Sequence, residues 1–219
     1  SQHRIDSVNI KAAGFTNISQ DHLDYHKNMQ EYFNSKKRLF TEILSNDGCS
    51  VICVDTREGK ELSKIIKKSG RYVMEVGKDA NSLNLKKLIS IDKGIEMNFH
   101  YDGEEFFIPI KVEGYFQAIN ILCAAGLAIA SGSPSDKVFA TLKDLLPIIG
   151  RFEFCGYNKL NAKIYVDYAH TPDALASALI SLRNLTKGKI ILIFGCGGSR
   201  DKYKRPIMGE IAKKYADII

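Results

Sequence analysis

Side chains that could bind a metal ion or a phosphate are concentrated in the segment 19–26, which reads SQDHLDYH. The carboxylates of Asp21 and Asp24 and the imidazole of His22 are common metal ligands. The same pattern suits the start of a helix, because Asp21 could cap it and Asp24 would lie in its first turn. A zinc site built on His22 and His26 is a poorer interpretation, because no third ligand has suitable spacing. A helix cap and a metal site both stay open at this point.

A glycine-rich loop, Gly195-Cys196-Gly197-Gly198-Ser199-Arg200-Asp201, joins a predicted strand to a predicted helix. Its glycines would let backbone N–H groups approach an anion, and the planar guanidinium of Arg200 suits a carboxylate or a phosphate. The loop matches neither of the common phosphate-binding patterns, G-x-G-x-x-G and G-x4-G-K-[ST]. An anion site and a tight turn with a solvated Arg–Asp pair are therefore both open interpretations.

The segment 166–172, VDYAHTP, ends a predicted strand and enters a predicted helix. Ligands of α/β proteins gather at the carboxyl ends of strands, so Asp167 and His170 are candidate binding residues. Either side chain could equally cap the helix. In the run YFNSKKRLF, by contrast, three consecutive basic residues (Lys36, Lys37 and Arg38) are typical of a solvated helix face.

Composition excludes several classes of protein. The 219 residues are 45% hydrophobic and 26% charged, which predicts a globular protein with a real core. A net charge of +6 suits an anionic ligand but not a dedicated nucleic-acid binder. Five cysteines without a C-x-x-C pair argue against disulfides or zinc and favour a reducing cytoplasm. The longest apolar run is about half the roughly 20 residues that span a bilayer.

Hydrophobic periodicity predicts an α/β fold. Strands are expected at 7–18, 49–55 and 71–77 and helices at 27–44 and 57–68, an alternation that implies a mostly parallel sheet with crossover helices. Antiparallel strands are expected at 86–92, 94–101 and 104–110, the last two joined by Asp102-Gly103. Helices should follow at 115–130 and at 134–146, the latter capped by Ser133.

The stretch 147–151 is the candidate boundary between two domains, 1–150 and 151–219. Beyond it we expect the opening of a Rossmann-like domain, with a helix at 172–186, a strand at 189–195, a helix from about 206 to 215 and the start of a strand at the end. The chain begins without Met and closes on an apolar Ala-Asp-Ile-Ile. We therefore expect it to be a piece of a longer polypeptide.

The order of these motifs resembles that of the Mur ligases. FTNISQDHLDYHKNMQEYFNSKKRLF is similar to the family segment F-T-N-L-x-x-D-H-L-D-Y-H with its Y-F-x-x-K-x-x-L-F helix. VDYAHTPDAL resembles the element that opens the family's third domain. GCGGSRDKYKRPIMG is similar to G-C-G-G-D-R-D-x-x-K-R-P-x-M-G of the diaminopimelate-adding branch, with Ser199 in place of an Asp. The resemblance covers essentially the whole chain.

This resemblance implies ATP-driven amide formation. ATP would phosphorylate the D-Glu carboxylate of UDP-MurNAc-L-Ala-D-Glu, and the amine of meso-diaminopimelate would attack the acyl phosphate, with Mg²⁺ offsetting negative charge. Residues 1–150 would be the later part of a central ATPase domain without its P-loop. Residues 151–219 would begin an amino-acid-binding domain. The fragment alone should be inactive and the protein a cytoplasmic monomer.

The resemblance also implies roles for individual residues. Lys36 would be a carbamate that, with His22, serves catalysis and binds Mg²⁺. Because fourteen residues separate the two, about 21 Å in one helix, the chain must bend near 26–28. The remaining implied contacts are Gln2 and Arg4 to the UDP-MurNAc-peptide, Arg200 to diaminopimelate, and Asn120, Arg151, Asp167 and His170 to ATP. Gln117 replaces an Asn that the family usually carries.

Alternatives remain within and outside this family. A lysine-adding Mur ligase and a ligase of the folylpolyglutamate synthetase type share the proposed fold and chemistry. A non-catalytic nucleotide-binding module is a third possibility. A His/Asp metal-dependent hydrolase built on DHLDYH would leave the VDYAHTP and GCGGSRD motifs unexplained.

Overall fold

A six-stranded sheet forms the larger part of the molecule. The computed structural model describes residues 5–19, 26–197 and 204–219. The sheet has the order β1-β2-β3-β4-β5-β6, in which the first four strands are parallel and the last two pairings are antiparallel. Its strands are β1 (Ile10–Phe15), β2 (Leu44–Cys53), β3 (Val73–Gly77), β4 (Leu83–Ile91), β5 (Gly94–Tyr101) and β6 (Glu104–Ile110). The predicted α/β class with antiparallel strands is confirmed.

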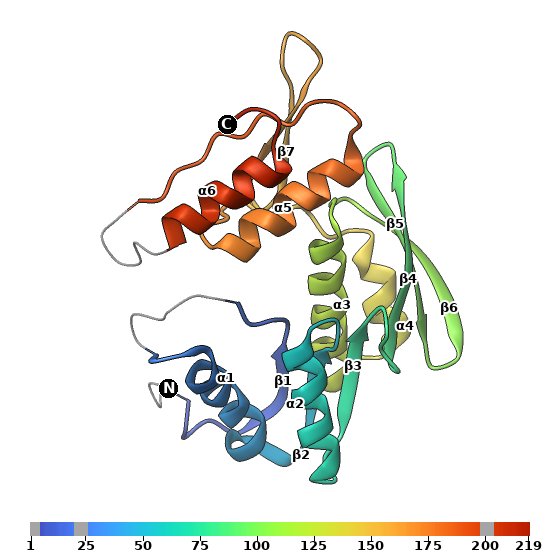
Figure 1. Cartoon of the computed structure of the whole chain (residues 1–219). Helices are drawn as coiled ribbons and strands as arrows, with labels where there is room; N and C mark the ends of the chain where they lie inside the picture. The colour runs from blue at the N-terminus through green and yellow to red at the C-terminus, as the bar shows by residue number, and fades with distance from the viewer. Residues whose placement is uncertain (1–4, 20–25, 198–203) are drawn as a thin grey trace.

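Helices cover both faces of the sheet, as Figure 1 shows. One face packs against α1 (Met29–Arg38), the π-helix η1 (Leu39–Ile43) and α2 (Arg57–Lys68). The other packs against α3 (Tyr115–Ala130) and α4 (Ser135–Leu142). The chain at β2 serves both cores: Val51 and Cys53 face α3, whereas Ile52 and Val54 face α1 and α2. Burial on both faces explains the nearly continuous apolar run that the sequence shows there.

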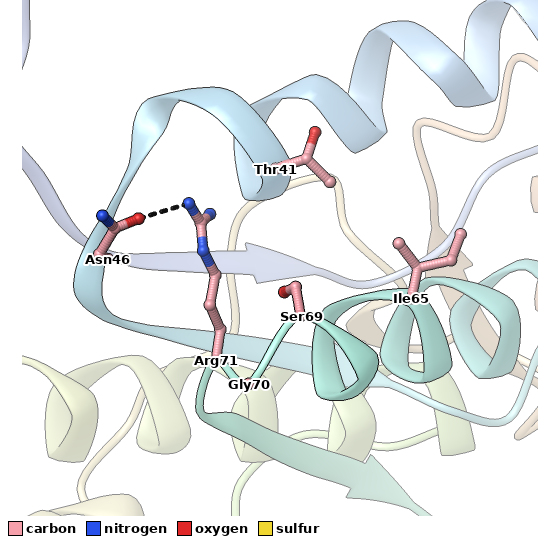
Figure 2. Close-up of a pocket in the computed structure, with 6 residues that line it drawn as sticks. All are labelled: Thr41, Asn46, Ile65, Ser69, Gly70 and Arg71. Carbon is pink, nitrogen blue, oxygen red and sulfur yellow. Dashed lines mark hydrogen bonds between the residues drawn. The ribbon is translucent and has the colours of Figure 1, made fainter.

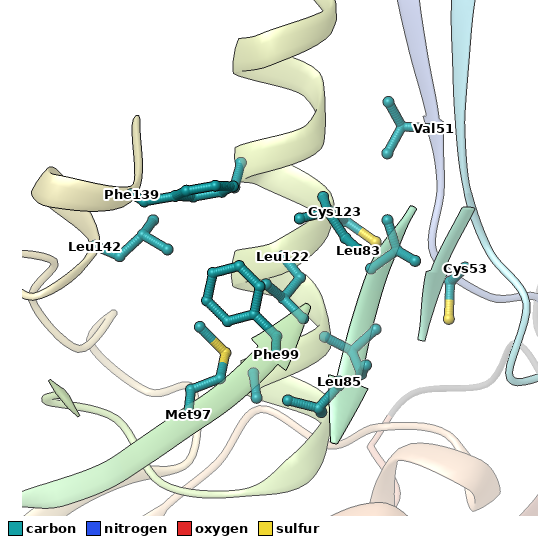
Figure 3. Close-up of a cluster of buried hydrophobic side chains, with 14 of the residues drawn as sticks. Val51, Cys53, Leu83, Leu85, Met97, Phe99, Leu122, Cys123, Phe139 and Leu142 are labelled. Carbon is teal, nitrogen blue, oxygen red and sulfur yellow. The ribbon is translucent and has the colours of Figure 1, made fainter. Parts of the chain in front are cut away.

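The core between the sheet and α3 is drawn in Figure 3. It joins Phe99 of β5 to Phe139 of α4, whose rings meet edge to face at 5.1 Å. Burial raises the pKa of Cys53 to about 11 and that of Cys123 to about 12. Both thiols are therefore neutral core residues. All five cysteines are free, as the sequence predicts.

A second, smaller unit follows the predicted boundary. It contains the antiparallel pair β7 (Glu153–Tyr157) and β8 (Lys163–Val166), then α5 (Pro172–Leu185) and α6 (Lys204–Tyr215). Figure 1 shows α5 and α6 side by side above the sheet and its covering helices. Their small core includes Leu179 and Met208.

Several of the expected elements differ from the structure. The helix predicted at 27–44 begins only at Met29, because the backbone of Asn28 is extended and its side chain accepts a hydrogen bond from Glu31 N. After Arg38 it changes to η1, and β2 then begins at Leu44, five residues before the predicted start. The predicted strand at 189–195 is extended but forms only one parallel bridge, Ile191 to Ile218, because β8 pairs with β7 instead.

The helix predicted at 134–146 is shorter than expected. Pro134 rather than Ser133 occupies the N-cap position, without a capping side-chain hydrogen bond. The helix ends at Leu142, ahead of Pro147, and proline disfavours helical geometry in the residue that precedes it. The strand expected to start at the end of the chain forms only the bridge at Ile218. The other predicted strands and helices form, with ends that match or are shifted by a few residues.

Candidate functional site

The turn before β7 and the end of β8 bring two predicted ATP-binding residues together. Asp167 follows β8 directly, and its carboxylate accepts hydrogen bonds from Phe152 N at 2.7 Å and from Ala169 N at 2.9 Å. The guanidinium of Arg151 lies over the Tyr168 ring, 4.7 Å from its centroid. A cation stacked on an aromatic ring keeps its charge while being held in one place. The residues at the end of β8 therefore hold the side chains of Asp167 and Arg151 in place.

His170 joins the same group and connects it to the segment after the glycine-rich loop. Its ring meets the Tyr168 ring edge to face at 5.3 Å, and its Nδ1 lies 3.1 Å from the Tyr168 carbonyl oxygen. The His170 carbonyl accepts a hydrogen bond from Lys204 Nζ at 2.8 Å. Lys204 opens α6, so parts of two sequence motifs meet here.

Helix α5 begins directly after this group. Thr171 caps it by accepting a hydrogen bond from Ala174 N at 3.3 Å, and Pro172 occupies its first turn. The free N–H groups of a helix start favour a negative charge nearby. Together with Arg151 and His170, they form a setting that suits phosphate or another anion.

Helix α3 holds the turn from the other side. Gln117 is buried and its Nε2 donates to the Arg151 carbonyl at 2.8 Å. The turn has left-handed backbone at Gly150 (φ 69°) and at Phe152 (φ 51°), and the Phe152 ring packs on Phe116. Asn120, the predicted adenine contact, is exposed on α3 three residues after Gln117. The sequence analysis noted Gln117 only as a departure from the family pattern and did not predict its hydrogen bond to the Arg151 carbonyl.

Glu113, just before α3, makes a second polar contact between the two units. Its Oε2 accepts a hydrogen bond from the Tyr165 hydroxyl, and its Oε1 lies 3.6 Å from Lys163 Nζ. Burial, followed by the bond to Glu113, raises the pKa of Tyr165 well above its ordinary value. Tyr165 therefore remains a hydrogen-bond donor throughout the physiological pH range.

A polar cluster that the sequence analysis missed lies at the carboxyl ends of β2 and β3. Asp55 accepts hydrogen bonds from the Tyr115 hydroxyl and from Lys78 N, the latter at 2.8 Å. The Lys78 ammonium lies 4.4 Å from the centroid of the Tyr115 ring. At Gly77 (φ 140°) a Cβ would lie 2.2 Å from Asp55 Oδ1, so only glycine fits. The sequence contained a signal for this cluster, because Asp55, like Asp167, is a carboxylate at the end of a predicted strand.

A cavity of about 550 Å³ lies beside this cluster and reaches α5. Lys78, Tyr115 and neighbouring residues of β4 and β5 line one side, and Ser181 and Asn184 of α5 line the other. Such a volume is within the range of small-molecule sites. The cavity therefore lies between the two units, with residues of both in its lining.

Lys36 lies on α1, away from the contacts described above. It is partly buried, with its ammonium 5.0 Å from the Tyr32 ring centroid, and that ring stacks on the buried His26. Helix α1 begins at Met29 because the backbone of Asn28 is extended. His22 lies outside the described residues, so the expected bend between His22 and Lys36 stays a prediction. Arg38 is more than a surface charge, because its guanidinium binds Asp6 and Glu42.

Several predicted site residues lie outside the described residues. They are Gln2, Arg4, His22 and Arg200, together with Ser199. Within residues 5–19, 26–197 and 204–219, no three His, Cys, Asp or Glu side chains are grouped to hold a metal ion. The structure thus brings Arg151, Asp167 and His170 together, places Asn120 on α3 three residues after Gln117, and leaves Lys36 on a separate helix.

A second cavity, of about 480 Å³, lies at the opposite end of the strands (Figure 2). Arg71, just before β3, donates to the Phe40 carbonyl at 2.6 Å and to Asn46 Oδ1 at 2.7 Å. Thr41, Ile65, Ser69 and Gly70 complete the lining. Arg71 here joins the end of the α1–η1 segment to β2, which is a structural task.

Comparison with known proteins identifies relatives over the whole chain. Residues 1–128 match the family model described as Mur ligase middle domain, and residues 150–219 match Mur ligase, glutamate ligase domain. The chain is 41% identical over 218 residues to UDP-N-acetylmuramoyl-L-alanyl-D-glutamate--2,6-diaminopimelate ligase from Agrobacterium fabrum, and equally to the ligase of that name from Rhizobium meliloti. Each comparison covers 100% of this chain but 45% of the relative, so the chain spans less than half their length.

Solved structures agree with these relatives. A solved structure of a ligase with the same name is 27% identical, with a TM-score of 0.69 over 97% of this chain and 44% of that one. MurF ligase from Thermotoga maritima in complex with ADP gives a TM-score of 0.80 at 17% identity, over 97% of this chain and 48% of that one, and supports the fold alone. Among the described residues, no helix combines the length and apolarity needed to cross a membrane.

Proposed function

Because the chain belongs to the Mur ligase family, we propose that it is part of an ATP-dependent ligase that adds meso-diaminopimelate to UDP-MurNAc-L-Ala-D-Glu. The names of the relatives that are 41% identical support this choice of substrate. The reaction joins a carboxylate to an amine through an acyl phosphate, and ATP supplies the phosphoryl group.

The meeting of Arg151, Asp167 and His170 at the start of α5 carries the proposal. Arg151 would bind a phosphate oxygen of ATP, since a fixed guanidinium stabilises charge that develops during phosphoryl transfer. Asp167 holds the turn and would contact the ribose, and His170 would contact the phosphates. Asn120 on α3 would hold the adenine.

Lys36 and His22 would serve the acyl transfer as Mg²⁺ ligands. The partly buried amine of Lys36 can react with CO₂, and a carbamate carries the oxygen donors that Mg²⁺ prefers. Bound Mg²⁺ would neutralise phosphate charge. The ring of Tyr32 beside Lys36 limits the directions in which the side chain can extend.

The remaining roles follow the same family pattern. Gln2 and Arg4 would contact the UDP-MurNAc-peptide, and Arg200 would bind the carboxylate of diaminopimelate. Residues 1–150 would belong to the central ATPase domain and 151–219 to the amino-acid-binding domain of a cytoplasmic, monomeric enzyme. We expect the 219-residue chain alone to be inactive.

The test is amino-acid-dependent phosphate release by the intact ligase, with diaminopimelate, lysine and glutamate offered as acceptors. We expect release with diaminopimelate and, in Arg151→Ala, at least a tenfold rise in KM for ATP, equivalent to about 1.4 kcal/mol of lost binding. Arg71→Ala is the matched control: it also removes a guanidinium, here one that makes two hydrogen bonds at the opposite end of the sheet, and it should keep KM. Release with lysine or glutamate alone would identify a sister ligase, and no release would favour a binding module.

A further inference from the structure

The peptide bond between Arg151 and Phe152 is held on both sides by buried or partly buried side chains. Its carbonyl accepts a hydrogen bond from Gln117 Nε2 at 2.8 Å, and its N–H donates to Asp167 Oδ2 at 2.7 Å. Gln117 comes from α3 of the larger unit, whereas Asp167 follows β8 of the smaller one. One peptide group is thus shared by the two units.

This turn needs such support because its backbone is unfavourable. Gly150 and Phe152 both lie in the left-handed region, which a non-glycine residue such as Phe152 rarely adopts. The Phe152 ring is 4% exposed and packs between Phe116 and Tyr165. Loss of the Gln117 donor would leave the Arg151 carbonyl without its partner in a packed region, which is costly.

We infer that Gln117 is a positioning residue, which places the Arg151 guanidinium over Tyr168 by holding the Arg151 carbonyl from α3. The inference rests on the proposed role of Arg151 in binding ATP. Gln117 acts on the backbone and does not itself touch the nucleotide. An asparagine at this position would be one methylene shorter, so it would reach the carbonyl only after the turn or the helix shifted.

The first experiment measures the turn directly, in the 219-residue chain. Gln117→Met keeps the length of the side chain and removes the donor. Trypsin cleavage after Arg151 and amide exchange at Phe152 should both speed up by about tenfold. Ile119→Val is the matched control, because Ile119 is buried on the same helix and loses packing without loss of that donor. Equal rates in wild type and Gln117→Met would overturn the inference.

The second experiment measures ATP use by the intact ligase. Gln117→Met should raise KM for ATP about tenfold with kcat changed little, because an ATP-binding group is misplaced. Gln117→Asn, which keeps an amide donor, should restore part of the loss, and Ile119→Val should keep KM. A KM unchanged by Gln117→Met would overturn the positioning role. If Arg151→Ala also left KM unchanged, the proposed function would fail, while faster cleavage in Gln117→Met would still show that Gln117 holds the turn.

Discussion

At the scale of single residues, Glu75 is the most heavily bonded carboxylate in the sheet. Its Oε1 accepts hydrogen bonds from Ser63 Oγ at 2.5 Å and Lys67 Nζ at 2.6 Å, and its Oε2 accepts one from Asn81 Nδ2 at 2.9 Å. Burial alone would raise the pKa of Glu75, but the bonds from Lys67 and Ser63 outweigh burial and lower it. Glu75 therefore fastens α2 to β3 in its charged form.

We predict that Glu75→Gln lowers the free energy of unfolding by about 1–3 kcal/mol at pH 7. Because the folded pKa of Glu75 lies below its unfolded value of about 4.3, its contribution is present above that pH. It is then lost as pH falls through the folded pKa. Urea unfolding followed by circular dichroism between pH 7 and pH 3 should show the two proteins converging in acid. The exposed Glu61→Gln on α2 is the control, and a pH-independent difference between Glu75→Gln and the wild type would contradict the prediction.

The candidate site could be predicted in part. Asp167 and His170 stand out because polar residues at a strand end gather at one edge of an α/β sheet. Arg151 precedes its strand, and nothing in local periodicity places it beside them; its role came from the family resemblance. The contact of Gln117 depends on how α3 packs against a turn 34 residues later, which no local pattern encodes.

At the scale of elements, two helical glycines meet opposite surroundings. At Gly59 in α2, an added Cβ would lie 1.9 Å from the Cys53 carbonyl oxygen, so the helix approaches β2 too closely for any side chain. At Gly209 in α6, an added Cβ would meet nothing within 4 Å. The same substitution should thus have opposite effects in the two helices.

We predict that Gly59→Ala destabilises the protein by more than about 2 kcal/mol, because the clash involves backbone that cannot move aside. Gly209→Ala should instead stabilise it by about 0.5–1 kcal/mol through helix propensity. Thermal melts of both variants test the pair. Equal shifts in Tm would show that the close approach of α2 to β2 is wrong.

Helices and strands were predictable where the hydrophobic periodicity and the residues that end an element agree. Helices α2 and α3 match their predicted ranges because amphipathic or apolar runs end at clear breaks. The prediction of a strand at 189–195 was wrong for a different reason. A strand needs a neighbouring strand to pair with, and β8 pairs with β7 instead. The chain changes from α1 to the π-helix η1, which contains the buried Phe40, and a count of apolar spacings does not predict this change.

At the scale of the whole molecule, one aromatic ring joins the two units. Phe152 packs on Phe116 of α3 and on Tyr165 of β8, with ring centroids 5.5 and 5.1 Å apart. We predict that Phe152→Ala costs about 3–5 kcal/mol and lets the units unfold separately. Calorimetry should then show two transitions in place of one.

Phe154→Ala is the control for this prediction. Phe154 lies two residues along on β7 and is 42% exposed, so its loss should cost much less and keep one transition. A single transition in both variants would mean that the other contacts of the junction suffice to couple the units.

The uneven burial of the cysteines has a practical consequence. Cys49, Cys53 and Cys123 lie in the core, Cys196 is partly covered beside Met208, and Cys155 is exposed on β7. A maleimide dye should therefore label Cys155 first, without any engineered residue. Since β7 begins two residues after Arg151, the fluorescence of a dye on Cys155 would report on rearrangements of the turn between the two units.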